Sequence, residues 1–204
     1  HGTRGGDIDY ALLLDGLEAE REQGITIDVA WRHLETPRRR FLVADCPGHA
    51  QYTRNMATGA SVADLAIVLV DATRGLLPQT FRHTAIASMF GVRHVLLAVN
   101  KMDRVGHDQA VFDGIADAYR AHAAKLGIAS VTAIPLAAAS GANVTVPASE
   151  TMAWYDGPTV LDFLESVEVE PRGAGLPARL PVQLVQRDGE GGRWLAGTVA
   201  SGTL

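Results

Sequence analysis

Three polar side chains, Asn100, Lys101 and Asp103, stand at the end of the apolar run "RHVLLAVN". A turn after a strand is the simplest explanation, because Asn and Asp are common loop residues. The same three residues also offer an amide, an ammonium and a carboxylate on five consecutive positions, "VNKMD". Such a group can recognise a polar ligand if the fold brings further donors and acceptors beside it.

Two other motifs also follow apolar runs. "DCPGH" places Asp45, Gly48 and His49 after "RFLVAD", and "AAASGAN" (137–143) follows "SVTAIPL" (130–136). Gly48 would permit a phosphate to approach the backbone closely, although proline-glycine alone would indicate only a turn. Open α/β sheets bind ligands beyond the carboxyl ends of their strands, so the motifs are expected at one edge of a sheet.

The order of the motifs predicts a guanine-nucleotide site. An aspartate-x-x-glycine is followed by Asn-Lys-x-Asp and then by a loop of small residues. Asp103 can accept hydrogen bonds from the guanine ring nitrogen and its exocyclic amine, which adenine does not offer. An unpaired buried carboxylate would disfavour adenine strongly, because an unmet charged hydrogen bond is costly. We expect Asn100 to connect neighbouring loops and the stem of Lys101 to lie over the nucleotide.

The elements that must position these motifs alternate along the chain. The runs 65–71, 93–100 and 130–136 are typical of buried parallel strands, and helical spacing between them predicts helices at 79–91 and 108–127. This alternation predicts a doubly wound α/β domain. Ahead of it we expect a helix at 7–22 and an antiparallel hairpin of strands 25–34 and 40–45 at the edge of the sheet.

Composition limits the function classes. The chain of 204 residues has a net charge of -5, which gives no general basic surface for nucleic acid. Cys46 is the single cysteine, so an intramolecular disulfide and a cysteine-rich zinc site are excluded and a reducing, cytoplasmic location is expected. No apolar run approaches membrane-spanning length. The histidines other than His49 show no metal-ligand spacing.

The motifs resemble one family closely. "DGLEAEREQGITIDVAWR", "ADCPGHAQYTRNMATGASVADLAIVLVDATRGLLPQT", "RHVLLAVNKMD" and "WYDGPTVLDFLE" are similar to the GTPase subunit of bacterial ATP sulfurylase (sulfate adenylyltransferase subunit 1), a relative of elongation factor Tu. The resemblance runs over nearly the whole chain. It implies a doubly wound P-loop GTPase domain at 1–169, a linker at 170–178 and the first strands of a β-barrel domain at 179–204.

The resemblance also implies roles for individual residues. GTP would contact Asp45, Gly48, Asn100, Lys101, Asp103 and Ala138, the last through its backbone N–H to the guanine carbonyl. Mg²⁺ would be held by the Thr26 hydroxyl and, through water, by Asp45. His49 would position the water that attacks the γ-phosphate. Considered alone, Thr26 could equally be a β-branched strand residue, and His49 could be a polar residue at a helix N-terminus.

The sequence departs from the family pattern at two places. No Gly-x-x-x-x-Gly-Lys-Ser/Thr phosphate loop occurs, and the only lysines are Lys101 and Lys125. The family places that loop and its strand upstream of residue 1, so we expect the 204 residues to lack both. Ala137 stands where the family usually has serine, which removes one hydroxyl beside the base.

Three functions are compatible with these observations. The leading expectation is a GTP-hydrolysing subunit that assists formation of adenylyl sulfate on a separate catalytic subunit of ATP sulfurylase, with no nucleic-acid or membrane partner. The second is a translation-type factor that carries aminoacyl-tRNA. The third is a nucleotide-binding module without hydrolysis.

Overall fold

The computed structural model describes residues 3–4, 7–8, 25–169, 175–187, 189 and 191–202. Contacts divide the chain into two units, His1–Val167 and Glu168–Leu204. The elements of the first unit are β1 Thr3–Arg4, β2 Asp7–Ile8, β3 Ala30–Glu35, β4 Arg40–Asp45, η1 Ala50–Tyr52, α3 Thr53–Ala60, β5 Leu65–Asp71, α4 Pro78–Met89, β6 His94–Asn100, η2 Met102–Val105, α5 Gln109–Lys125, β7 Ser130–Pro135 and α6 Val160–Ser166. Those of the second are β8 Leu184–Arg187 and β9 Arg193–Ala196, paired antiparallel.

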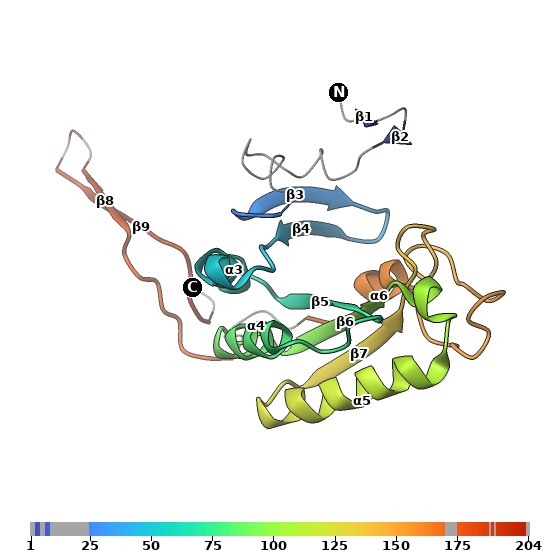
Figure 1. Ribbon diagram of the computed structural model, residues 1–204. Coiled ribbons are helices and arrows are strands. Elements are labelled where there is room, and N and C mark those ends of the chain that lie inside the picture. The colour runs from blue at the N-terminus through green and yellow to red at the C-terminus, as the bar shows by residue number, and fades with distance from the viewer. Residues whose placement is uncertain are drawn as a thin grey trace. The chain divides into compact units, whose positions relative to one another are not determined.

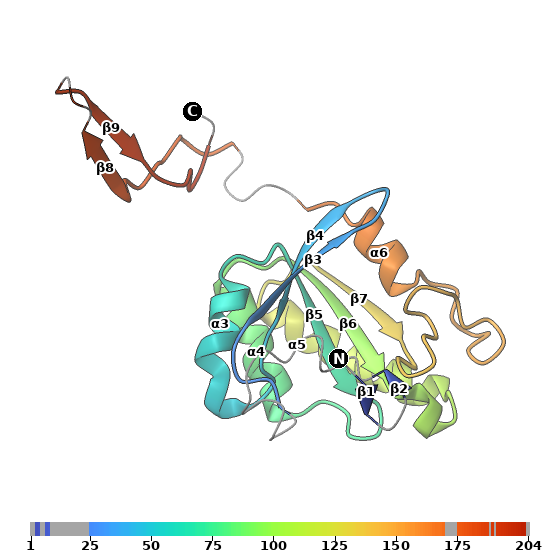
Figure 2. The ribbon, with the colours of Figure 1, turned by 90° about the horizontal axis from the view of Figure 1, so that it is seen from above.

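A three-stranded parallel sheet forms the centre of the first unit. Its order is β5-β6-β7, and the strands run side by side with their arrowheads at one end (Figure 2). The register pairs Asp71 of β5 with Asn100 of β6, so polar residues end two neighbouring strands at the same edge. The three parallel strands predicted from the apolar runs are confirmed to within one residue at each end.

Helices cover the two faces of this sheet unequally. Helices α4 and α5 lie on one face (Figure 1), where Val70, Val95, Leu97 and Tyr119 belong to the larger apolar core. On the other face Phe163 of α6 packs with side chains of β6 and β7. The predicted doubly wound architecture is therefore confirmed. On β5, Ile67 and Leu69 are 44% and 65% exposed, since α6 covers only its neighbours.

The predicted hairpin is present but is shorter and placed differently. Strands β3 and β4 pair antiparallel, and their sheet has no backbone hydrogen bond to β5, so the prediction of an edge position on one continuous sheet is wrong. The ladder stops at Ala30 because its partner Asp45 is the last residue of β4, ahead of Pro47. Residues 25–29 are therefore not in the strand, and there the Val29 N–H donates to the Asp28 carboxylate.

Arg39, at the turn of the hairpin, fastens it to the rest of the first unit. Its guanidinium donates to the carbonyls of Leu164 and Val167 at 2.8 and 2.7 Å, at the C-terminus of α6. Arg38 beside it forms an ion pair with Glu165 at 3.3 Å. Carbonyls at a helix C-terminus lack intrahelical partners, so a cation there donates hydrogen bonds to them and also interacts favourably with the negative end of the helix dipole.

The last two points concern the start of the chain and the length of its helices. The predicted helix at 7–22 is wrong at Asp7–Ile8, which pair as a strand with Thr3–Arg4, and its remaining residues lie outside the described ones. Within the part of the chain that the structure describes, no helix is long and apolar enough to span a bilayer.

Close packing of α3 against the segment after β4 gives a test of the fold. A Cβ built on Gly59 would overlap Cys46 Sγ, with Ala44 Cβ at 3.5 Å behind it. We expect Gly59→Ala to lower the free energy of unfolding by about 1 kcal/mol, because overpacking outweighs the gain in helix propensity. In a Cys46→Ala background the same change should instead stabilise the protein. Urea unfolding of the parent, the two single variants and the double variant measures the change in free energy of unfolding that Gly59→Ala causes in each background. A change of the same sign in both backgrounds would disprove the packing argument.

Candidate functional site

The polar residues at the end of β6 connect two loops. Asn100 Oδ1 accepts the N–H of Lys101 at 2.8 Å and the N–H of Ala138 at 3.0 Å. The second bond joins the "NKMD" segment to the loop after β7. The expectation that Asn100 connects neighbouring loops is met by this geometry. The N–H of Ala138, expected to face a guanine carbonyl, is here donated to Asn100.

The backbone turns sharply directly after Asn100. Lys101 has φ +64 and ψ +35, a left-handed conformation that is uncommon for a residue other than glycine. Met102, fully buried, then anchors η2, and its N–H donates to the Leu136 carbonyl at 3.0 Å. These constraints leave the side chains of Lys101 and Asp103 exposed at the rim of the sheet. A rigid backbone thus presents one cation and one carboxylate to solvent.

The loop 137–143 is held by a residue that our sequence analysis did not single out. Asn143 is 3% exposed, its Nδ2 donates to the Pro135 carbonyl at 2.9 Å, and its Oδ1 accepts the Ala148 N–H at 2.7 Å. Its φ is +57, which Asn tolerates better than most residues. This buried amide, bonded at both ends, ties the end of the loop to the last residue of β7, and backbone bonds between Ala137 and Ala142 close the loop around Ala138. An Asn directly after a Gly-Ala pair in a loop was the available signal.

Asp71, which our sequence analysis also did not single out, meets the end of β6 from β5. Its Oδ2 accepts from Lys101 Nζ at 2.7 Å, and its Oδ1 accepts from the Thr73 N–H at 2.9 Å and the Thr73 hydroxyl at 2.6 Å. The bond from Lys101 and those from Thr73 lower the pKa of Asp71 from its ordinary 3.8 to about 2. The carboxylate is therefore charged at neutral pH, and any stability that it contributes is lost only as pH falls from about 4 towards 2.

The "DCPGH" motif lies at the end of β4. Asp45 is the last residue of the strand, Pro47 is buried, and Gly48 and His49 are exposed. Among the described residues other than Gly48 and its two chain neighbours, no atom lies within 4 Å of a Cβ built on Gly48, so this part of the chain leaves room there for a ligand oxygen. Burial, and to a lesser extent the Asp45 charge, raises the pKa of Cys46 to about 11, which leaves its thiol protonated and unreactive at neutral pH.

Thr26 and His49 belong to segments that one hydrogen bond ties together. Asn55 in α3, six positions after His49, donates from Nδ2 to the Ile27 carbonyl at 2.7 Å, and Ile27 adjoins Thr26. No cluster of three or more His, Cys, Asp or Glu side chains suited to a metal ion occurs among the residues described. Mg²⁺ usually takes one or two protein oxygens and completes its shell with water and phosphate, and the Thr26 hydroxyl and the Asp45 carboxylate are oxygen donors of this kind.

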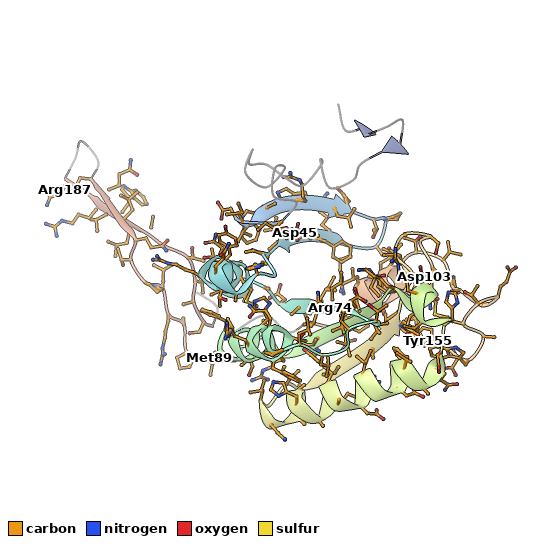
Figure 3. All side chains as sticks on the ribbon, in the orientation of Figure 1. Asp45, Arg74, Met89, Asp103, Tyr155 and Arg187 are labelled. Carbon is orange, nitrogen blue, oxygen red and sulfur yellow. The ribbon has the colours of Figure 1, made fainter. Side chains whose placement is uncertain are left out.

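The structure therefore places the expected site residues in two groups. Asn100 ends β6, and Lys101, Asp103 and Ala138 lie on the linked loops after β6 and β7. Asp45 ends the hairpin, and Gly48 and His49 follow it. Figure 3 shows Asp45 and Asp103 on these different elements, Asp45 on the hairpin and Asp103 among the loops near α6.

Comparisons with known proteins identify relatives of this chain. The chain is 60% identical to "Bifunctional enzyme NodQ" of Rhizobium sp. (strain N33), over 100% of the chain and 31% of that protein. It is 53% identical to "Sulfate adenylyltransferase subunit 1" of Tolumonas auensis, over 100% of the chain and 43% of that protein. The chain thus spans less than half the length of these relatives.

Solved structures resemble the fold at lower identity. The crystal structure of bacterial selenocysteine-specific elongation factor EF-Sec matches with a TM-score of 0.62 and 25% identity, covering 93% of this chain and 30% of the other. The family model described as "Elongation factor Tu GTP binding domain" matches residues 2–170. This range includes the three parallel strands and every residue of both groups. The chain belongs to the elongation factor Tu GTP-binding domain family.

Proposed function

We propose that this chain is the GTP-binding part of a regulatory GTPase subunit of ATP sulfurylase, in the cytoplasm. It would couple GTP hydrolysis to formation of adenylyl sulfate from ATP and sulfate. The observation that carries the nucleotide site is the Asn100–Ala138 hydrogen bond, which assembles the loops after β6 and β7 into one rim. Relatives named as sulfate adenylyltransferase subunits, identical at more than half of the positions, support the choice among GTPases.

Base recognition follows from the exposed groups on this rim. Asp103 accepts two hydrogen bonds from guanine, and the stem of Lys101 covers one face of the ring. When GTP binds, the Ala138 N–H leaves the side-chain oxygen of Asn100 and donates to the guanine carbonyl instead. The oxygens of Asn100 and guanine both keep a donor, because Asn100 still accepts the N–H of Lys101. The amide of Asn100 remains beside the base, and the base, bonded to both Asp103 and Ala138, then joins the two loops.

Hydrolysis is assigned to the other group of residues. His49, exposed directly after Gly48, orients the attacking water, and the Gly48 backbone lies beside the γ-phosphate. Thr26 and, through water, Asp45 would hold Mg²⁺, which would neutralise charge on the phosphates. The phosphate loop that cradles the β-phosphate in this family is not among the 204 residues, so hydrolysis is measured on the full-length protein.

The partner is a catalytic subunit that carries the adenylating site. The name "subunit 1" of the Tolumonas auensis relative implies a second subunit for that protein. We infer the same for this one and place its contact near Tyr52 and Arg54, which follow His49. Tyr52 lies 6.5 Å from His49, ring centre to ring centre, and Arg54 is exposed at the start of α3. A change at the γ-phosphate thus has a short path to this surface.

A stimulation assay tests this function. GTP turnover of the full-length protein is measured alone, with an ATP sulfurylase catalytic subunit, and with ribosomes and aminoacyl-tRNA. We expect stimulation only by the catalytic subunit. Exchanging both Tyr52 and Arg54 for alanine should reduce that stimulation at least about tenfold, the loss of roughly one interface hot spot, while basal hydrolysis stays unchanged.

The matched control is Arg120→Ala, which removes the same charge from an exposed position on α5. It should leave stimulation as in the parent protein. Stimulation by ribosomes instead would replace the proposed function with a translation-type one. Equal stimulation of the double variant and the parent would exclude the surface at Tyr52 and Arg54 but not the function.

A further inference from the structure

We propose that Asp71 is a positioning residue of the nucleotide site, which holds the ammonium of Lys101 so that its aliphatic stem is fixed over the base. This role rests on the proposed function. It concerns a residue of β5, a strand that carries none of the groups so far assigned to the base. Lys101, in contrast, carries the base contact directly.

The position of Asp71 follows from strand register. Asp71 ends β5 and pairs with Asn100, which ends β6, and the Ala72 N–H then donates to the Asn100 carbonyl at 2.8 Å. The two strand ends are thus held together one residue past the ladder. Lys101, next along the chain, turns left-handed and sends its side chain back to β5.

The carboxylate itself is held in one orientation. Oδ1 accepts both the N–H and the hydroxyl of Thr73, and Oδ2 remains for the Lys101 ammonium at 2.7 Å. The Asp71 side chain is 23% exposed, whereas that of Lys101 is 49% exposed. A partly shielded and pre-oriented carboxylate therefore faces the tip of a flexible and more exposed lysine.

This arrangement reduces the cost of ordering Lys101 when nucleotide binds. A lysine side chain has four rotatable bonds, and immobilising a side chain of this kind weakens binding by about two- to tenfold. An ion pair that restricts the side chain beforehand removes part of this cost. The pair leaves the methylene stem, not the ammonium, available for the flat face of a base.

The test is a double-mutant cycle on full-length protein. The probe is a fluorescent GDP analogue, and the proteins are the parent, Asp71→Asn, Lys101→Met and the double variant. We expect Asp71→Asn to weaken binding by about two- to fivefold, part of the full ordering cost, and to raise the KM for GTP without changing kcat. In the Lys101→Met background, which keeps a stem but has no ammonium, Asp71→Asn should have no effect.

The matched control is Asp64→Asn, which removes the same charge from an exposed residue ahead of β5. It should leave the affinity unchanged. Unchanged or tighter binding by Asp71→Asn, or an equal loss in both lysine backgrounds, would overturn the role of Asp71 while guanine binding by the parent stands. A parent protein without guanine-nucleotide binding would instead overturn the proposed function, and this role with it.

Discussion

Asp103→Asn should lower the affinity of the full-length protein for GTP at least about 100-fold, since two hydrogen bonds to a charged acceptor are lost. The asparagine amide also points a donor at the donors of guanine. Xanthine carries a carbonyl where guanine has its exocyclic amine, so the variant should bind xanthosine triphosphate more tightly than GTP. Titration calorimetry with both nucleotides measures the reversal.

The structure supplies a close control for this change. Asp113→Asn makes the same substitution at an exposed position on α5, beyond η2, and should bind GTP as the parent does. Asp103 lies in η2, where the buried Met102 fixes the backbone, so the variant should keep its fold. If the parent protein binds ATP as tightly as GTP, the assignment of Asp103 to the base is wrong.

His49→Ala should reduce the GTP turnover number about 100-fold or more while the affinity for GTP stays close to that of the parent. A side chain that orients the attacking water acts mainly in the transition state, so its loss affects kcat and spares ground-state binding. His49 is exposed and makes no side-chain cap at η1, and its removal therefore leaves no buried polar group unpaired. Single-turnover hydrolysis and nucleotide binding, measured on the same preparations, separate the two quantities.

His33→Ala, on the exposed surface of β3, is the control for removal of an imidazole. It should hydrolyse GTP at the parental rate. A turnover number for His49→Ala equal to that of the parent would remove His49 from the mechanism. A parallel loss of affinity and turnover would assign His49 to binding.

The sequence determined the parallel sheet and the identity of the rim residues. Runs such as "LAIVLVD" and "RHVLLAVN" are apolar at nearly every position because both faces of such strands can be buried, and they match β5 and β6 closely. Asn100, Lys101 and Asp103 could be found because they follow a buried parallel strand in the order Asn-Lys-x-Asp, at the edge where open α/β sheets bind ligands. Such patterns can be recognised in the sequence because they involve only residues that are adjacent along the chain.

Tertiary structure decided what those patterns leave open. Apolar and polar residues alternate along the hairpin sequence as expected for strands. The number of paired residues, however, depends on where β4 ends, and the position of the hairpin depends on the hydrogen bond from Arg39 to α6. The role of Asp71 depends on strand register, which pairs it with Asn100, a residue 29 positions away. A strand-final aspartate has the same local sequence whether or not a lysine returns to it, because that contact is set by the packing of two strands and the left-handed turn at Lys101.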